Sequence, residues 1–351
     1  MSFRPDPYGR DATHPFQIPL KGWRQVAQRV WAESVRDNFF VIAAGCAFFA
    51  LFAIFPVLSG LISFYGLISD PATIQLQFSL LGLVLPPQAY EMVVEQAKRL
   101  FEVSSSTLGW SLAASIGLAL WSVTASTYAI FCALNVAYEE TERRSMLRFY
   151  LRAFIFAVAG IFGGVVALLS VVYVPVAFAF TGYPADFERF VALARWPVLA
   201  VMALILFACF YRYGPSRRSA QWRWVVPGSV FATIVWLIAS AGFSLYVSNF
   251  ADYDKVYGSL GAAIMLLFWL YLSFYIFLFG AEINAELELQ TAQDTTAGKP
   301  KPIGERGAFV ADHVAGGPEG TMRPVSLVAL DPATAKPGRT PKKPRKERRA
   351  P

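Results

Sequence analysis

Charged residues are absent from six long stretches of this chain. The stretches cover residues 38–69, 103–138, 153–185, 196–211, 224–251 and 256–281. A charged side chain at the centre of a membrane helix costs roughly 2.5–3.5 kcal/mol on insertion scales, and a helix of about 20 residues crosses the hydrocarbon core. Five stretches exceed that length. The fourth is extended by apolar residues 191–194, because Arg195 beside Trp196 can reach outward to the interface. The pattern predicts an all-α, polytopic membrane protein with six transmembrane helices.

Two segments outside these stretches have an amphipathic helical pattern. The first is residues 21–36, with an apolar face made of Trp23, Val26, Ala27, Val30, Trp31 and Val35. This pattern predicts a helix that lies in the membrane interface, and packing against the bundle is the alternative. The second is residues 89–101, where apolar positions recur at helical spacing after Pro86 and Pro87. We expect this second helix to cap the outer face of the bundle.

Composition fits the same picture and suggests three parts. The chain is 56% hydrophobic and 16% charged, against about 25% charged in soluble domains. We assign residues 1–37 to a cytoplasmic segment that carries the interfacial helix, and residues 38–288 to a six-helix transmembrane domain. Residues 289–351 are rich in Pro, Gly, Lys and Thr, and we predict a disordered tail. Its basic end, 336–349, favours contact with anionic lipid over a specific nucleic-acid site.

Basic residues predict the orientation in the membrane. The N-terminal segment, the loops after spans 2 and 4 and the C-terminal tail hold 26 of the 31 Lys and Arg residues. The remaining loops hold 5. Because Lys and Arg accumulate in cytoplasmic loops, both termini are expected in the cytoplasm.

Polarity inside the predicted spans is uncharged, which disfavours a carboxylate proton relay at the midplane. In span 2, polar residues recur at three- and four-residue steps and form a stripe that runs toward the expected cytoplasmic end of the span. Its members are Thr124, Tyr128, Asn135, Tyr138 and Glu142. The stripe is consistent with a polar vestibule or with hydrogen bonds between helices, and the pattern leaves both open.

Small residues and prolines suggest how the helices meet. Ala43 with Ala47 and Gly160 with Gly164 recur at four-residue steps, which predicts close helix contacts. Pro56 lies well inside span 1 and is expected to bend or break that helix.

The sixth span ends in acidic and polar residues. Glu282 and Asn284 lie at the end of the span that is expected on the cytoplasmic side. The arginines expected at the same level are Arg143, Arg144, Arg217 and Arg218. A salt-bridge network that holds the helix ends together is one interpretation, and a gate or lipid-headgroup site is the other. Asn249 and Tyr257 form a candidate counterpart on the outer side.

Several motifs occur in order along the chain. Span 6 contains Tyr-Gly-Ser-Leu-Gly-Ala at 257–262, Trp-Leu-Tyr at 269–271 and Gly-Ala-Glu-Ile-Asn-Ala-Glu at 280–286. Further landmarks are Ala43 to Pro56, the residues Leu134, Asn135, Tyr138 and Arg143, and the residues Tyr211, Arg212, Tyr213, Pro215, Pro227 and Gly228.

These motifs resemble the YihY/BrkB family of bacterial inner-membrane proteins, long labelled "ribonuclease BN", over about residues 20–288. The resemblance implies a six-helix inner-membrane protein. It implies no agreed activity, since members have been discussed as serum-resistance factors and as possible transporters, including in lipid export.

The residues argue against a nuclease. Metal-dependent hydrolysis of RNA needs clustered His, Asp or Glu, yet the two histidines, His14 and His313, lie in opposite tails. We therefore predict no enzyme activity and no cofactor.

The favoured hypothesis is translocation of a lipid or another amphiphile, with membrane lipids as partners. The alternative is a membrane scaffold or an envelope-integrity factor. For translocation, the candidate pathway or gate residues are Asn135, Tyr138, Glu142, Arg143, Glu282, Asn284, Asn249 and Tyr257.

Overall fold

The computed structural model describes residues 6–68, 105–168, 185–250 and 259–315, and these residues form an all-helical fold. The helices are η1 (Pro15–Gln17), α1 (Leu20–Arg36), α2 (Phe39–Ile68), α5 (Ser105–Ala137), α6 (Met146–Leu168), α8 (Ala185–Tyr213), α9 (Trp222–Phe250), α11 (Ser259–Leu289) and α12 (Phe309–Asp312).

Each of the six charge-free stretches overlaps one of the long helices in the described part of the chain. Five of them are long and apolar enough to cross a membrane, over Phe39–Ser59, Ile116–Ala137, Met146–Ala167, Trp222–Val247 and Ala263–Leu289. The apolar part of α8 is shorter, Pro197–Tyr213, because Asp186, Glu188 and Arg195 occupy its first turns. As the sequence suggested, α8 begins well before residue 196. The helix α2 continues through Pro56 without a break.

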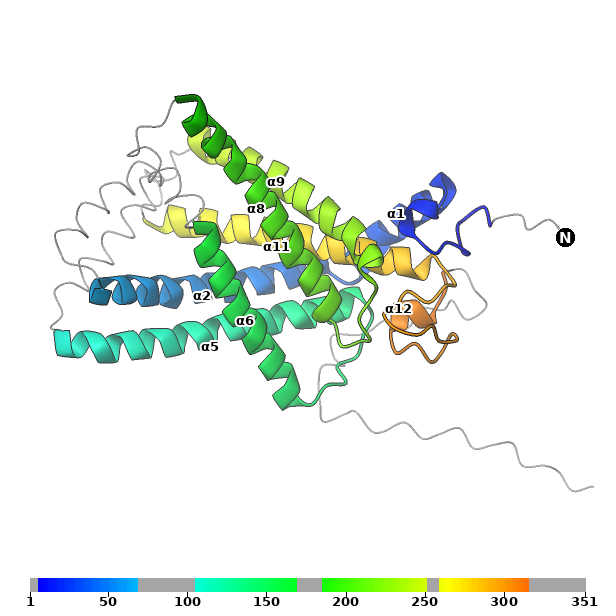
Figure 1. Cartoon of the computed structure of the whole chain (residues 1–351), viewed down its shortest axis with the longest axis horizontal. Helices are drawn as coiled ribbons and strands as arrows, with labels where there is room; N and C mark the ends of the chain where they lie inside the picture. The colour runs from blue at the N-terminus through cyan, green and yellow to red at the C-terminus, as the bar shows by residue number, and fades with distance from the viewer. Residues whose placement is uncertain (1–5, 69–104, 169–184, 251–258, 316–351) are drawn as a thin grey trace, which may run out of the picture.

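The long helices form a bundle with a distinct end (Figure 1). α2 packs along α5 and α11, α9 packs along both α8 and α11, and α6 packs on α5. Contacts between α6 and α8 are sparse. α1 and α12 gather where α2 and α9 begin and where α5, α8 and α11 finish. We call this end of the bundle the α1 end.

The tightly packed core lies at the α1 end. Its members include Phe39, Phe131, Leu134, Tyr138, Phe149, Tyr211 and Leu278. These residues come from the turns of their helices nearest α1, whereas many apolar side chains farther along are exposed, such as Phe52, Trp121 and Ile238. An exposed apolar belt is what a lipid-facing surface requires.

The sequence predicted one of the close contacts that small residues make in the described part of the chain. Ala43 and Ala47 are fully buried, as expected. Gly160 has open space instead, because a Cβ built there meets no described atom within 4 Å. The closest approach joins Gly228 of α9 to Gly280 of α11, where a Cβ on Gly228 would lie 2.0 Å from the Gly280 carbonyl oxygen.

Both interpretations of the amphipathic N-terminal helix find support in α1. Val26 and Val30 are buried with Leu287 of α11 and Trp224 of α9, so the helix packs against the bundle. Trp31 remains 65% exposed on another side of α1. This exposed tryptophan suits the membrane interface.

Residues 290–315, placed in a disordered tail by their composition, are folded in the structure. Arg306 is buried and donates to the backbone carbonyls of Ala292 (2.8 Å), Gln293 (3.0 Å) and Ala311 (2.7 Å). Val310 belongs to the bundle core. Hydrogen bonds from one arginine side chain to backbone carbonyls order this segment. Such contacts leave no apolar periodicity in the sequence, so the composition alone predicted disorder. Residues 316–351 and the predicted helix at 89–101 lie outside the described residues.

Candidate functional site

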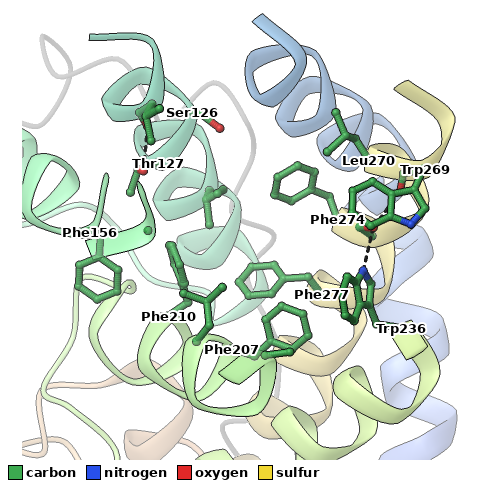
Figure 2. Close-up of a pocket in the computed structure, with 16 residues that line it drawn as sticks. Ser126, Thr127, Phe156, Phe207, Phe210, Trp236, Trp269, Leu270, Phe274 and Phe277 are labelled. Carbon is green, nitrogen blue, oxygen red and sulfur yellow. Dashed lines mark hydrogen bonds between the residues drawn. The ribbon is translucent and has the colours of Figure 1, made fainter. Parts of the chain in front are cut away.

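A cavity of about 330 Å³ lies among five helices inside the apolar part of the bundle. The lining comes from α5, α6, α8, α9 and α11, and Figure 2 shows it as mainly aromatic. Its aromatic members are Phe156, Phe207, Phe210, Trp236, Trp269, Phe274 and Phe277. We call it the aromatic cavity. Its volume lies at the lower end of the range of about 300–1,000 Å³ that is typical of ligand pockets.

Phenylalanine rings close the cavity toward the α1 end. Phe156, Phe210 and Phe277 are the lining residues nearest that end on α6, α8 and α11. The ring centroids of Phe156 and Phe210 lie 4.9 Å apart, and those of Phe210 and Phe277 lie 5.9 Å apart, both edge-to-face. Phe131 packs beneath them, with its centroid 5.2 Å from that of Phe156. These four rings form an aromatic floor.

Three polar groups in the cavity wall donate hydrogen bonds within the protein. Trp236 Nε1 donates to Ser273 Oγ (3.0 Å), and Ser273 Oγ donates to the carbonyl of Trp269 (2.8 Å). Thr127 Oγ1 donates to the carbonyl of Val123 (2.8 Å). These donors are therefore committed within the protein, and the aromatic surface that remains suits an apolar chain rather than a hydrated solute.

The sequence did not predict this cavity, because none of the site residues expected from the sequence lines it. A signal was present in part, because the lining residue Trp269 belongs to a family motif. The convergence of the lining residues depends on the tilts of five helices, which no local pattern encodes.

Three predicted site residues lie together beyond the floor, at the end of α5. Asn135 Oδ1 accepts from the Ser216 backbone N–H (2.7 Å), and Asn135 Nδ2 donates to Glu142 Oε2 (3.0 Å). Arg143 donates its backbone N–H to Ser216 Oγ (3.0 Å). Burial alone would raise the pKa of Glu142, but hydrogen bonds from Arg144 and Asn135 lower it below the ordinary value. These contacts tie α5 to the loop between α8 and α9.

Two more predicted residues, Tyr138 and Asn284, are buried nearby. The guanidinium of Arg217 lies 4.2 Å from the centroid of the Tyr138 ring. Asn284 Oδ1 accepts from the Gly228 backbone N–H (2.7 Å). Tyr138 Oη and Asn284 Nδ2 are buried without a hydrogen-bond partner in the described structure. Burial raises the pKa of the Tyr138 hydroxyl above its ordinary value.

The two residues of the proposed outer counterpart lie near the end of α9 and in the segment that follows it. Asn249 belongs to α9, at the end remote from α1, and its side chain lies outside the described part of the chain. Tyr257 also lies outside the described residues.

Glu282 does not join the arginines that the sequence placed near it. Those arginines have other partners: Arg144 with Glu142, Arg217 with Glu288, and Arg218 with the carbonyl of Lys299. The reason is helical phase. Glu282 and Glu286 share one face of α11 at a four-residue step, and Glu288 points to another face. Glu282 is 3% exposed, and its Oε2 has no hydrogen-bond partner among the described residues.

Glu139 is a further acidic residue at this end, in an unusual backbone conformation. It follows α5 with φ at 52°, a left-handed conformation that costs a non-glycine residue about 1 kcal/mol. Its Oε1 accepts from Arg36 Nη2 (3.1 Å). Burial raises the pKa of Glu139 to about 7, although Arg36 opposes the shift, and the carboxylates of Glu33 and Asp37 add to it.

We expect Glu139→Gln to reduce the pH dependence of stability. The folded state holds the Glu139 proton more tightly than the unfolded state, so stability falls as pH rises from about 4.5 to about 7. Glutamine removes this loss, with a relative gain of about 1 kcal/mol above pH 7 after allowance for solvent screening. Thermal unfolding in detergent at several pH values measures the effect. Equal midpoint differences between variant and wild type at low and high pH would contradict it.

Within the described residues, no group of three or more His, Cys, Asp or Glu side chains could hold a metal ion.

Comparison with known proteins supports membership of one family. Residues 30–304 match the family model described as "Virulence factor BrkB". A "putative ribonuclease-like protein YfkH" of Bacillus subtilis is 40% identical over 183 residues, 51% of this chain and 66% of that protein. A UPF0761 membrane protein of Rhodospirillum centenum is 26% identical over 298 residues, 83% of this chain and 62% of its own length. Another UPF0761 membrane protein, from Psychromonas ingrahamii, is 27% identical over 264 residues, which are 74% of this chain and 86% of that protein.

The chain thus spans slightly under two thirds of the length of the first two relatives. The ribonuclease-like name belongs to the Bacillus subtilis protein. No solved structure matches this chain. The family model covers most of the sequence and the structure has long apolar helices, so this chain is an integral membrane protein that belongs to the BrkB family.

Proposed function

We propose that this protein translocates a lipid or another amphiphile across the bacterial inner membrane, with the α1 end in the cytoplasm. The aromatic cavity is the observation that carries this proposal. Its committed polar groups and aromatic walls suit an acyl or similar apolar chain, for which burial contributes about 0.8 kcal/mol per CH₂ group. The concentration of Lys and Arg in the N-terminal segment and in the loops after spans 2 and 4 supports the orientation.

The proposed path has two regions, the aromatic cavity and the polar region between the aromatic floor and the α1 end. An apolar chain would occupy the cavity, and a polar headgroup would pass the buried residues Asn135, Tyr138, Glu282 and Asn284 and the more exposed residues Glu142 and Arg143. In the described conformation the aromatic floor separates the two. Passage therefore requires Phe156, Phe210 and Phe277 to part, as expected of a transporter closed on one side.

Gly160→Leu is the variant that tests the cavity most directly. Gly160 lines the cavity and has room for a side chain, so leucine fills the space without a clash in the described structure. We expect photo-crosslinking by a phospholipid with a diazirine on its acyl chain to fall at least fivefold at the lining segments of α6, α8 and α11. Transfer of a fluorescent phospholipid between the leaflets of reconstituted vesicles should fall in parallel.

Gly164→Leu is the matched control, because Gly164 lies one turn farther along α6 and outside the lining. It should retain both crosslinking and transfer. Crosslinks confined to the exposed outer faces of the helices, or wild-type transfer no faster than in protein-free vesicles, would overturn the proposal.

A further inference from the structure

Five carboxyl groups from distant parts of the chain meet at the α1 end. Glu33 belongs to α1, Asp37 follows that helix, and Glu139 follows α5. Glu282 and Glu286 come from α11. Glu282 lies one turn before Glu286 on the same face of α11, and Glu286 pairs with Arg29 of α1, so Glu282 belongs to this group. We call these residues the carboxylate cluster.

Two arginines of α1 partly neutralise this cluster. Arg29 pairs with Glu286 and also donates from Nη2 to the Glu286 carbonyl (3.2 Å). Arg36 contacts Glu33, Asp37 (3.8 Å) and Glu139 (3.1 Å). Counting only the described residues, five carboxylates against two guanidinium groups leave an excess of three negative charges if every carboxyl is ionised. Arginine cannot adjust this balance, since it stays protonated in proteins.

Glu282 is the member of the cluster without a cationic partner among the described residues. It is 3% exposed, and its buried Oε2 has no hydrogen-bond donor. An isolated buried carboxylate is so unfavourable that such a group normally becomes neutral by binding a proton. The Tyr138 hydroxyl and the Asn284 amide nitrogen are buried nearby, and among the described residues neither of them donates a hydrogen bond to Glu282.

A metal ion does not fit this cluster, because the described carboxylates do not converge on a common point. We propose that the carboxylate cluster is a proton-binding site centred on Glu282, loaded and emptied near neutral pH through the α1 end. The nearby groups outside the apolar helices titrate in the right range: burial raises the pKa of Asp37 to about 6 and that of Glu139 to about 7. Burial also raises the pKa of Glu33.

Proton loss has a mechanical consequence, because the cluster joins three elements. α1, the end of α5 and α11 meet there through Arg29 and Arg36. Each lost proton adds negative charge between them and weakens their packing. The site therefore couples the pH at the α1 end to the position of α1 against α11. This proposal does not depend on lipid translocation, since protonation is measured directly.

Infrared difference spectroscopy tests it on the full-length protein in lipid nanodiscs. Stepping the pH from about 5 to about 9 should remove a carbonyl band of a protonated carboxylic acid, with a midpoint between about pH 6 and pH 8. Glu282→Gln should remove the part of that band that belongs to Glu282, while Asp37 and Glu139 still contribute to the rest. The control Glu305→Gln, at an exposed position, should leave it unchanged.

A second variant keeps the proposal testable if the Glu282→Gln protein does not fold. Glu139→Gln removes one negative neighbour of Glu282, so the midpoint should move to lower pH by at least half a unit. The proposal is overturned if the wild-type protein shows no protonated-acid band in this range. It is equally overturned if neither variant changes the band.

Discussion

Arg217→Met is expected to destabilise the protein by about 3–5 kcal/mol, the usual cost of removing one partner from a buried ion pair. Arg217 and Glu288 both have fully buried side chains and are joined by two hydrogen bonds, at 2.7 and 3.1 Å. Without Arg217, the hydroxyl of Thr295 (2.6 Å) is the one remaining donor to the Glu288 carboxylate among the residues that the structure describes. Thermal unfolding of the purified protein in detergent, followed by circular dichroism, measures the loss.

Two further variants separate charge from packing. Arg217→Met combined with Glu288→Gln should recover most of the stability, because the neutral amide still accepts from Thr295 and leaves no buried charge. Arg148→Met is the matched control on the exposed surface of α6, and it should change stability by less than about 0.5 kcal/mol. A double variant as unstable as Arg217→Met would show that the pair is not the source of the effect.

Gly228→Ala should have the second large effect, a loss of about 3 kcal/mol. The added Cβ would lie 2.0 Å from the Gly280 carbonyl oxygen and 2.6 Å from Oδ1 of Asn284. The first of these atoms belongs to the backbone, so no side-chain rotation relieves the clash and α9 must move away from α11. The same unfolding measurement detects it, together with loss of the hydrogen bond from Gly228 to Asn284.

Gly242→Ala provides the control on the same helix. A Cβ at Gly242 meets no described atom within 4 Å, and alanine favours a helix over glycine by about 0.5–1 kcal/mol. This variant should match or slightly exceed the wild-type stability. If both alanine variants behaved alike, α9 and α11 would not approach each other as closely as described.

The candidate site shows which features local patterns can predict. Asn135, Tyr138 and Asn284 were singled out because polar side chains are rare in apolar helices, and they are indeed buried at the α1 end. The sequence did not reveal what they contact. Asn284 accepts from the buried backbone N–H of Gly228, which lies inside α9, far away in the chain.

The same limit applies to the two proposed sites. The aromatic cavity needs five helices at particular tilts, and its lining residues look individually like ordinary lipid-facing or core side chains. The carboxylate cluster needs α1 to pack on the last turns of α11, which brings Glu33 next to residues some 250 positions later. No periodicity links such residues, so each was visible only as a separate acidic residue.

The sequence by itself determined that this chain is helical and resides in a membrane, because the cost of burying charge acts on each segment independently. It also determined the family, through motifs read in order. Only the tertiary structure decided which glycines touch, how residues 290–315 fold, where a cavity opens and which carboxyl group is left without a partner. Those features depend on contacts between segments far apart in the chain, and their energies appear only when the helices are packed together.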